Sequence, residues 1–509
     1  MNQSLYALIE SRFPADPSRI LIETDGGAAY SWRDLDALTA RYARLMSELG
    51  LAKGDRVAVQ TDKSPQAMFL YLACLRGGFI FLPMNTAYQP DEVDYLVGNA
   101  EPRLLVCRPE VETTTKDIAA AHGCLNVLTM DGDGRGSFAE AAQAVPADFS
   151  TVDCAADDVA CILYTSGTTG RPKGAMLTHR NLSANALALV SYWGITAGDV
   201  LLHALPIFHA HGLFVACNTT LLAGARMLWL ARFDGDRVLE LLSRATTFMG
   251  VPTFYTRLLA SPRLTRDACR HMRLFVSGSA PLLEETFRAF EERTGFSILE
   301  RYGMTETGMN TSNPLTGERR PGTVGFPLPG VSVRAVGDDG NVLGTDGVGV
   351  LQVKGENVFS GYWRMPEKTG EDFTADGWFK TGDVGKIDAD GYVHIVGRAK
   401  DLIISGGYNV YPKEVESVVD RIDGVVESAV IGVPHPDFGE AVTAVVKRLP
   451  GRTDVTEAAV IAEVKTRIAN YKVPKTVHFV EELPRNAMGK VQKNVLREMF
   501  SSRVSSLIG

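Results

Sequence analysis

The segment Tyr164-Thr165-Ser166-Gly167-Thr168-Thr169-Gly170-Arg171-Pro172-Lys173-Gly174 decides how this chain is interpreted. Its three glycines let the backbone approach a ligand closely, so that successive N–H groups converge on an anion, while the hydroxyls and Lys173 add further donors. The apolar run 159–164 before it is typical of a buried strand, which places the segment at a strand end. The spacing is not the GxxxxGK[ST] of a P-loop. The segment predicts a phosphate-binding loop, with a flexible Gly/Ser/Thr linker as the alternative.

The composition indicates a multidomain globular protein that acts on small molecules. A length of 509 residues exceeds what one hydrophobic core serves, and a net charge of −8 gives no basic footprint for nucleic acid or an anionic membrane. The seven cysteines show no paired spacing, which favours buried thiols in a reducing compartment over disulfides or a zinc site. Neither a signal peptide nor a membrane span is evident, because the most apolar stretch, 67–84, is interrupted by Arg76, Gly77 and Gly78. We expect a cytoplasmic protein without nucleic-acid or membrane partners.

Alternating strand and helix patterns predict a parallel, doubly wound α/β architecture. Apolar residues at helical spacing predict a helix over 32–50, followed by a strand over 56–60. Ser64 and Pro65 suit the N-cap and first position of a helix that runs to Leu75, before a strand over 79–82. The pattern restarts beyond about residue 400. A helix near 412–420, strands over 428–433 and near 442–447, and a helix over 458–469 predict a compact C-terminal α+β domain.

Seven further motifs follow the phosphate-binding segment along the chain. They are Leu205-Pro206-Ile207-Phe208-His209-Ala210-His211-Gly212, Ser277-Gly278-Ser279-Ala280-Pro281-Leu282, Glu300-Arg301-Tyr302-Gly303-Met304-Thr305-Glu306-Thr307, Gly361-Tyr362-Trp363, Thr381-Gly382-Asp383, Gly397-Arg398-Ala399-Lys400-Asp401 and Pro484-Arg485-Asn486-Ala487-Met488-Gly489-Lys490. In kind and order they resemble the motifs of the acyl-adenylate-forming (AMP-binding) superfamily, in particular its acyl-CoA synthetases. The resemblance implies that a carboxylate reacts with ATP to give acyl-AMP and pyrophosphate, after which the thiol of coenzyme A displaces AMP.

The same resemblance implies two domains and a set of nucleotide-binding residues. A large N-terminal domain would span 1–398, and a small mobile domain would span 399–509, with Lys400 at the hinge. Asp383 would accept hydrogen bonds from the ribose and Arg398 would be a second contact, although without the family Asp383 is equally typical of a turn. Tyr302 would stack on the adenine. The remaining nucleotide contacts implied are Thr165, Ser166, Gly167, Thr168, Thr169, Gly170, Lys173, Ser277, Gly278, Ser279, Ala280, Pro281, Glu300, Gly303, Met304 and Thr305.

Metal and catalytic roles are implied by the resemblance as well. Negative charge develops on the transferring phosphoryl group, so the reaction needs a metal ion. Glu306 matches the family's magnesium-binding glutamate, and Thr165 is expected at the same metal. Lys490 matches the catalytic lysine, whose ammonium bridges the carboxylate and the α-phosphate. Acetylation of Lys490 by a lysine acetyltransferase, reversed by a deacetylase, would remove that charge. Gly406 and Gly407 would line the pantetheine passage. Without the resemblance, Glu306 would be interpreted as a residue at a helix start, Lys490 as a solvated lysine, and Gly406 and Gly407 as part of a turn.

Arg301 and Gly303 are the clues to the acyl substrate. A buried guanidinium is costly without a partner, so an acid with a second carboxylate is its natural complement, unless Arg301 pairs with a nearby acidic side chain. Gly303 leaves room for a substrate longer than acetate. Among such acids, the resemblance to malonate-activating members of the family implies malonate, with methylmalonate as a second substrate since one methyl group changes binding by only about 1 to 3 kcal/mol. The other residues expected at this site are His209, His211, Ser277, Met304 and Arg232.

Several alternatives remain open at this point. One alternative is a synthetase for a short or medium monocarboxylic acid. It would share these motifs, but its substrate would have no second carboxylate to pair with Arg301. A carrier-protein-loading adenylation enzyme is disfavoured, because only 19 residues follow Lys490. A luciferase-type oxygenase and a pseudoenzyme that only binds nucleotide would share the fold. The oligomeric state, monomer or dimer, is left open.

Overall fold

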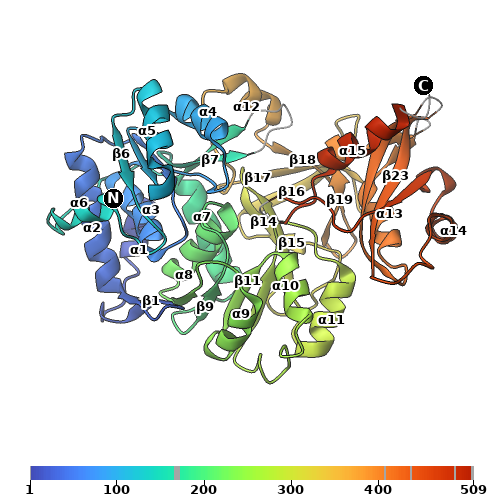
Figure 1. Ribbon diagram of the computed structural model, residues 1–509, viewed down its shortest axis with the longest axis horizontal. Helices are drawn as coiled ribbons and strands as arrows, with labels where there is room; N and C mark the ends of the chain where they lie inside the picture. The colour runs from blue at the N-terminus through green and yellow to red at the C-terminus, as the bar shows by residue number, and fades with distance from the viewer. Residues whose placement is uncertain (1, 166–171, 406–407, 436–437, 487–488, 506–509) are drawn as a thin grey trace. The chain divides into compact units, whose positions relative to one another are not determined.

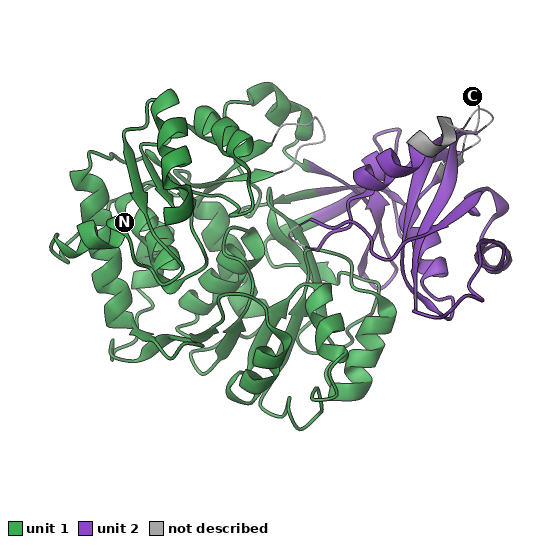
Figure 2. Cartoon of the chain, in the orientation of Figure 1, with its two compact units in different colours: residues 1–332, 353–379 green, residues 333–352, 380–509 purple. Residues whose placement is uncertain are grey.

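The computed structural model describes residues 2–165, 172–405, 408–435, 438–486 and 489–505 (Figure 1). The chain divides into two compact units, Met1–Ser332 with Val353–Phe379 and Val333–Gln352 with Lys380–Gly509 (Figure 2). This division falls near residue 380, whereas the expected hinge follows Arg398. The hinge stays a prediction. The expected phosphate contacts Ser166, Gly167, Thr168, Thr169 and Gly170, and the expected pantetheine contacts Gly406 and Gly407, lie outside the described residues.

Two sheets dominate the first unit. Among the described residues, the larger has the strand order β15-β14-β13-β12-β11-β9-β10-β1-β2, in which β1 and β9–β13 run parallel. The smaller has the order β6-β5-β3-β4-β7-β8, parallel from β6 to β7. The strands are β1 (Ile20–Thr24), β2 (Ala29–Ser31), β3 (Arg56–Gln60), β4 (Ile80–Pro83), β5 (Leu104–Cys107), β6 (Asn126–Thr129), β7 (Val159–Thr165), β8 (Lys173–Thr178), β9 (Val200–His203), β10 (Arg226–Trp229), β11 (Thr247–Gly250), β12 (Leu274–Ser277), β13 (Leu299–Met304), β14 (Gly308–Ser312) and β15 (Phe326–Pro327).

Helices cover both faces of these sheets, as expected for a doubly wound fold (Figure 1). Successive strand residues point to opposite faces, so Leu201 lies in the core between the sheets while Leu202 packs on the outer side. The helices between the sheets are α1 (Leu5–Glu10), α2 (Trp32–Glu48), α3 (Pro65–Gly77), α6 (Ser137–Gln143), α7 (His179–Tyr192) and α8 (Asn218–Leu222). Those on the outer faces are α4 (Pro90–Ala100), α5 (Glu112–Ala121), α9 (Gly235–Leu241), α10 (Pro252–Leu259) and α11 (Glu284–Thr294).

Local sequence explains where the first helices begin and end. The Ser31 side chain accepts a hydrogen bond from the Asp34 backbone, and the Asp34 carboxylate accepts one from Ser31, which forms a capping box for α2. Ser64 caps α3 through the Ala67 backbone, and Pro65 takes its first position. Gly78 ends α3 at φ 70°, a left-handed conformation that suits glycine. The predicted helices and strands up to residue 83 are therefore confirmed within two residues at each end.

The second unit holds a four-stranded sheet, β16-β17-β18-β19, and a five-stranded sheet in which β22 and β23 form a long antiparallel hairpin. The predicted C-terminal α+β pattern is confirmed, although its strands are longer than expected. The elements are β16 (Val331–Val336), β17 (Gly349–Gly355), β18 (Phe379–Ile387), β19 (Val393–Arg398), β20 (Ile403–Ser405), β21 (Tyr408–Val410), α13 (Pro412–Val419), β22 (Val425–His435), β23 (Gly439–Arg448), α14 (Glu457–Arg467), β24 (Thr476–Phe479) and α15 (Lys493–Ser505).

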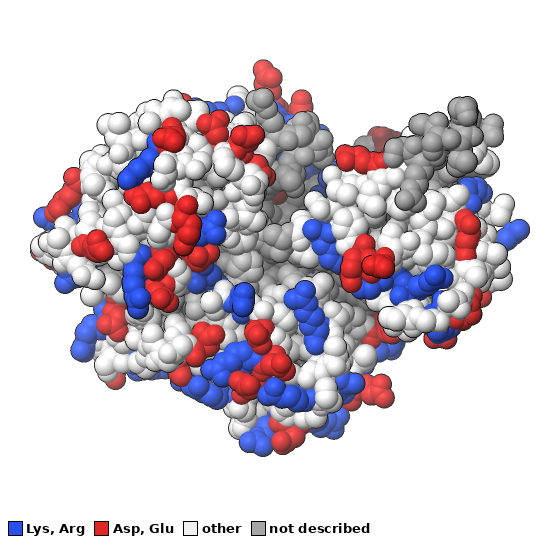
Figure 3. Space-filling model, viewed as in Figure 1, with Lys and Arg blue, Asp and Glu red and all other residues white. Residues whose placement is uncertain are grey.

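The surface and the cysteines agree with the composition. All seven cysteines are free and buried, as expected. On the face shown in Figure 3, positive and negative side chains are interspersed rather than gathered into a basic stripe. A helix long and apolar enough to cross a membrane is not found in the part of the chain that the structure describes.

Asp199 ties together the amino ends of three strands in the larger sheet. Its carboxylate, only 5% exposed, accepts hydrogen bonds from the Thr196 backbone at 2.8 Å and from the Thr246 hydroxyl at 2.7 Å. Arg273 donates twice at 2.7 Å. Burial would raise the pKa of Asp199, but the hydrogen bonds from Arg273, Thr196 and Thr246 outweigh it and lower the pKa.

Replacing Asp199 with Asn is expected to destabilise the protein by about 3 kcal/mol, because Arg273 and the buried donors lose their charged acceptor. Urea unfolding followed by tryptophan fluorescence measures this, since Trp193 also accepts from Arg273. A lowered pKa means that the contribution is complete at neutral pH and shrinks as pH falls below about 4. Asp157→Asn is the matched control, since that side chain is 77% exposed and pairs with Arg180. An equal effect of both substitutions would contradict the role of Asp199.

Candidate active site

The expected site residues of the first unit gather at the carboxyl ends of its parallel strands. Strand β7 ends at Thr165, β9 at His203 and β12 at Ser277, while β13 carries Arg301. Ligands of open α/β sheets bind at this edge, because loops there converge on the crevice beyond the strands. The two sheets meet at the site, since the Thr165 hydroxyl donates to Glu306 at 3.4 Å.

Glu306 and Thr165 offer the hard oxygen donors that Mg²⁺ prefers. Glu306 is 6% exposed, and its Oε1 also accepts a hydrogen bond from the Tyr362 hydroxyl at 3.2 Å. Clusters of three or more His, Cys, Asp or Glu side chains that could hold a metal are not found among the described residues. A single carboxylate fits Mg²⁺, which is usually bound by one or two carboxylates together with substrate phosphates. The residues therefore suit a metal that arrives with a nucleotide.

Lys173 begins β8 directly after the phosphate-binding segment and is buried at 9% exposure. Its Nζ lies 4.2 Å from the centre of the Tyr362 ring and 3.8 Å from Asp372 Oδ2. Asp372, the last residue of α12 (Pro366–Asp372), is closer to Lys368, at 2.9 Å. Asp372 therefore pairs more closely with Lys368 than with Lys173.

The loop after β12 is shaped by two residues of β13. Glu300 Oε1 accepts a hydrogen bond from the Leu282 backbone at 2.9 Å, which holds the far end of the loop. A β-carbon on Gly278 would lie 2.4 Å from the guanidinium carbon of Arg301, so only glycine fits there. Ser279 takes φ 72°, and Ala280 and Pro281 follow it along the loop. The expected adenine-side loop is thus also one wall of the Arg301 site.

Arg301 is the most unusual charge in the first unit. The residue is 3% exposed, and neither its Nε nor its Nη2 has a hydrogen-bond partner in the described ranges. Burial lowers the pKa of Arg301 to about 9, although Tyr255 and Glu300 act in the opposite direction. The alternative of a structural ion pair receives no support, because salt bridges to Arg301 are absent from the described part of the chain.

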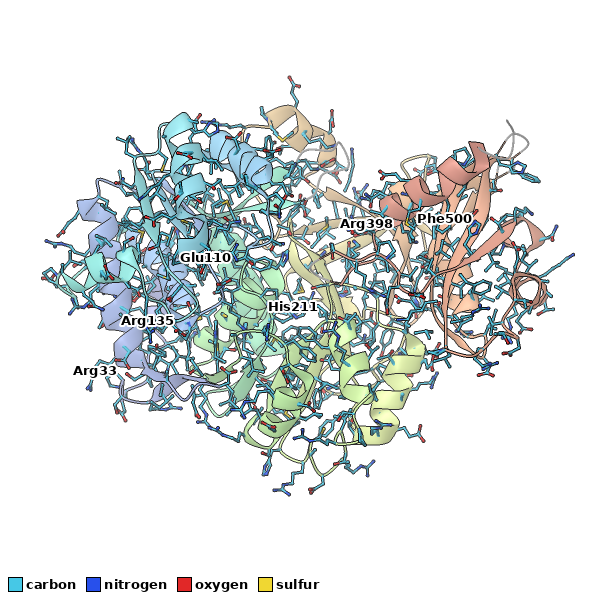
Figure 4. All side chains as sticks on the ribbon, in the orientation of Figure 1. Arg33, Glu110, Arg135, His211, Arg398 and Phe500 are labelled. Atoms are coloured by element: carbon cyan, nitrogen blue, oxygen red, sulfur yellow. The ribbon has the colours of Figure 1, made fainter. Side chains whose placement is uncertain are left out.

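Two histidines from the segment after β9 face the same region. His211 starts the π-helical segment η2 (His211–Cys217) and is labelled in Figure 4. Its Nδ1 lies 3.2 Å from Ser279 Oγ, and its Nε2 lacks a hydrogen-bond partner among the residues described. Burial and the nearby charge of Arg301 keep the pKa of His211 well below 6.5, and burial lowers the pKa of His209 to about 4. Both rings are therefore neutral at pH 7, and each offers one N–H.

The conformation of this segment depends on Gly212 and His203. A β-carbon on Gly212 would lie 2.0 Å from the Pro206 carbonyl oxygen. His203 Nε2 lies 2.9 Å from the Gly212 carbonyl, and because a carbonyl only accepts, Nε2 carries the proton. His203 was not among the residues predicted for the site, and it holds the backbone next to His211.

The structure does not assign the remaining predicted residues of the first unit to one role. A β-carbon on Gly303 would lie 2.1 Å from the Gly308 carbonyl oxygen on β14, so the hairpin alone requires this glycine. Its role in leaving room for the acyl group stays a prediction. Tyr302 and Met304 are half-buried, and Thr305 lines a small cavity with Ala210. Arg232 is exposed between β10 and α9.

The expected residues of the second unit also lie near one another. Asp383 on β18 and Arg398 on β19 are direct cross-strand neighbours, and Arg398 Nε lies 2.8 Å from Asp383 Oδ1. Figure 4 labels Arg398 at the end of β19. Desolvation and the positive charges of Arg398 and Lys400 lower the pKa of Lys490 to about 8, although part of the residue remains exposed to solvent. The Lys490 loop is held by Arg485, which donates to the Gly489 carbonyl and pairs with Glu427.

Fold and site together define an enzyme that activates an acid with a nucleotide. The AMP-binding enzyme family model matches residues 10–363, and the AMP-binding enzyme C-terminal domain model matches residues 414–490. The chain is 37% identical over 480 residues to a feruloyl-CoA synthase of Amycolatopsis sp, covering 93% of this chain and 95% of the relative. It is 34% identical over 534 residues to a malonate–CoA ligase of Arabidopsis thaliana, covering 95% and 87%.

The solved structures agree with the sequence relatives. ATP-bound MatB from Rhodopseudomonas palustris is 56% identical, with a TM-score of 0.96 over 98% of this chain and 99% of that one. The chain belongs to the AMP-binding enzyme family, and it is an acid–thiol ligase that uses ATP and coenzyme A. The expected fold class and family are confirmed.

Tyr362 and Asp372 lie at the site but were not among the residues predicted for it. Both come from the segment around the Gly361-Tyr362-Trp363 motif, which lies more than 50 residues beyond Glu306 in the chain. The motif is recognised in the sequence, but a tyrosine between glycine and tryptophan does not by itself indicate a site residue rather than a core residue. Its contacts depend on tertiary structure.

The lowered pKa of Lys490 predicts a pH limit on adenylation. If the ammonium of Lys490 is needed, kcat/KM for ATP should fall as pH rises through about 8, because this parameter follows the free enzyme. Pyrophosphate exchange over pH 6.5 to about 9.5 measures it. Thioester formation from preformed acyl-AMP should lack this limb. The same alkaline limb in both half-reactions would assign it to another group.

Proposed function

We propose that the protein joins malonate to coenzyme A through a malonyl-adenylate intermediate, with release of pyrophosphate and then AMP. The single observation that carries the choice of acid is the buried Arg301 guanidinium with two N–H groups lacking partners among the described residues. A substrate with a second carboxylate supplies the missing acceptor. The malonate–CoA ligase of Arabidopsis thaliana among the relatives supports this choice.

The donors around Arg301 suit one carboxylate. Its Nε and Nη2 are the two parallel N–H donors that carboxylates bind in bidentate fashion. Ser277 pairs with Glu300, the neighbour of Arg301, in the sheet, and His211 contacts Ser279 on the loop after Ser277. The His211 Nε2 and the Ser277 hydroxyl are buried and also lack partners in the described chain. Neutral histidine is preferable here, since a second cation beside Arg301 would add repulsion. The distal carboxylate would replace the solvation that all three side chains have lost.

In the first half-reaction the residues of both units control charge. Glu306 and Thr165 would hold Mg²⁺, which neutralises phosphate charge when bound, and Lys173 with the segment 165–170 would bind the phosphates. Ser277–Pro281, with Glu300 and Tyr302–Thr305, would enclose the adenine, while Asp383 and Arg398 would hold the ribose. The Lys490 ammonium would bridge the reacting carboxylate and the α-phosphate. Most of the rate enhancement then comes from positioning and electrostatics.

The second half-reaction would use a different set of residues. Rotation about Lys400 would withdraw Lys490 and bring Gly406 and Gly407 to the pantetheine of coenzyme A. His209, neutral at pH 7, lines the acyl and thiol route, and Met304 packs beside the acyl group. Arg232, which is exposed between β10 and α9, would contact substrate or coenzyme A.

A ligase for a monocarboxylic acid is the second candidate, favoured by the 37% identity to a feruloyl-CoA synthase. That assignment leaves Arg301 buried without a ligand acceptor, which is why malonate is preferred. Methylmalonate is proposed as a second substrate. We also propose a cytoplasmic location, a monomer or dimer, and control by acetylation of Lys490, which would remove the charge that adenylation needs.

Arg301→Met should lower kcat/KM for malonate by about 100-fold, because the loss of a charge-assisted pair removes roughly 3 kcal/mol, and should raise the relative activity on propionate and butyrate. Coenzyme A-dependent AMP release across acetate, propionate, butyrate, malonate, methylmalonate, succinate and ferulate measures it. Arg319→Met is the matched control, since Arg319 is also desolvated but donates to the Pro314, Ser297 and Leu315 carbonyls. An unchanged malonate preference in Arg301→Met would remove this residue from the acyl site.

Lys490→Ala should reduce adenylation by at least about 1000-fold while sparing conversion of preformed malonyl-AMP to malonyl-CoA, since only the first half-reaction needs the ammonium. Pyrophosphate exchange and single-turnover thioester formation separate the two. Lys465→Ala, an exposed lysine in the last turn of α14, serves as the control. Equal losses in both half-reactions would point to a general role for Lys490.

A further inference from the structure

Tyr362 contacts the two oppositely charged side chains that the proposed function assigns to magnesium and phosphate. Its hydroxyl donates to Glu306 Oε1 at 3.2 Å, and its ring lies under the Lys173 ammonium at 4.2 Å from the ring centre. The residue is 3% exposed. One rigid side chain thus separates an anion from a cation in a poorly solvated site.

The backbone around Tyr362 is fixed to the strand that carries Lys173. Ala175 on β8 forms a bridge with Tyr362, and the flanking bonds run from the Met176 amide to the Gly361 carbonyl at 2.9 Å and from the Trp363 amide to the Gly174 carbonyl at 2.7 Å. The Tyr362 amide donates to the Thr369 hydroxyl at 2.9 Å. Tyr362 and Lys173 therefore keep a constant spacing.

Tyr362 contacts both charged side chains, and a direct Lys173–Glu306 salt bridge is not found among the described residues. Opposite charges in a low-dielectric site attract strongly, and such a pair would occupy the groups that a metal and a phosphate need. An aromatic face holds an ammonium by cation–π attraction without neutralising it, and a phenol hydroxyl donates to a carboxylate without removing its charge. Tyr362 therefore contacts both side chains without neutralising either charge, while Asp372 Oδ2 lies 3.8 Å from the Lys173 ammonium.

We propose that Tyr362 is a positioning residue that sets the spacing between the Glu306 carboxylate and the Lys173 ammonium, so that Mg²⁺ and the nucleotide triphosphate bind as one unit. The hydroxyl orients the carboxylate for the metal, and the ring places the ammonium for the phosphates. This inference rests on the proposed assignment of Glu306 to magnesium.

The experiment compares Tyr362→Phe, which removes only the hydroxyl, with Tyr362→Leu, which also removes the ring. Binding of a non-hydrolysable ATP analogue is measured by calorimetry with and without Mg²⁺, and pyrophosphate exchange is measured against free Mg²⁺. Tyr6→Phe is the matched control, because the Tyr6 hydroxyl is buried among Thr39 and Arg76, away from the site. Glu306→Ala is the reference for loss of the metal ligand.

Tyr362→Phe should raise the free Mg²⁺ needed for half-maximal exchange about tenfold while leaving metal-free binding of the analogue unchanged. Tyr362→Leu should in addition weaken metal-free binding about fivefold, because Lys173 loses its platform. Tyr6→Phe should change neither. Thioester formation from preformed acyl-AMP should be retained by both phenylalanine variants.

Two results would overturn the proposal. In the first, Tyr362→Phe keeps the normal Mg²⁺ requirement while Glu306→Ala changes it. Tyr362 then does not position the metal ligand, and the proposed function stands. If Tyr362→Phe lowers every readout to the same extent, its role is structural. Unchanged magnesium dependence in Glu306→Ala would instead refute the assignment of Glu306 itself, and with it the basis of this inference.

Discussion

Desolvation of the Arg301 guanidinium constrains the elements around it more than any other single feature. Gly278 must lack a β-carbon because one would lie 2.4 Å from the guanidinium carbon. His211 must stay neutral, since a second cation would raise the electrostatic penalty, and burial beside Arg301 lowers its pKa accordingly. The result is a pocket rich in donors and poor in acceptors. Such a pocket is incomplete until an anion enters it, which links the stability of the empty site to the charge of the substrate.

The same physical problem, opposite charges in a poorly solvated space, is solved differently in the two units. In the first unit Tyr362 contacts both Lys173 and Glu306, and we propose that it sets their spacing. In the second unit Asp383 and Arg398 pair directly across neighbouring strands at 2.8 Å. A direct pair fixes the direction of the Asp383 carboxylate, as the proposed ribose contact requires. A separated pair suits ligands that carry full charges of their own, as a metal and a triphosphate do.

Sequence patterns predicted those features that depend on local spacing. The helices α2 and α3, the strand β7 before the phosphate-binding segment and the C-terminal α+β pattern follow from periodicity and, at the start of α3, from Ser64 and Pro65. Motif order predicted the family. The contacts among Tyr362, Glu306 and Lys173 could not be predicted, because they join segments far apart in the sequence, with Tyr362 and Glu306 separated by 56 positions. For Gly303 the sequence indicated room for a substrate, whereas the structure adds a backbone reason in the β13–β14 hairpin.

Reaction chemistry and acid selectivity occupy different parts of the site. Glu306, Lys173 and Tyr362 surround the proposed phosphate region, while Arg301, His211 and Ser277 surround the proposed acyl region, and the two groups share no hydrogen bond among the described residues. A relative named for ferulate and one named for malonate are nearly equally similar to this chain, at 37% and 34% identity. Identity to these two relatives therefore does not separate one acid from the other. In the proposed function, selectivity for a second carboxylate comes from a few buried donors, and the Arg301 guanidinium contributes most, because its desolvation would penalise every acid that cannot supply an acceptor.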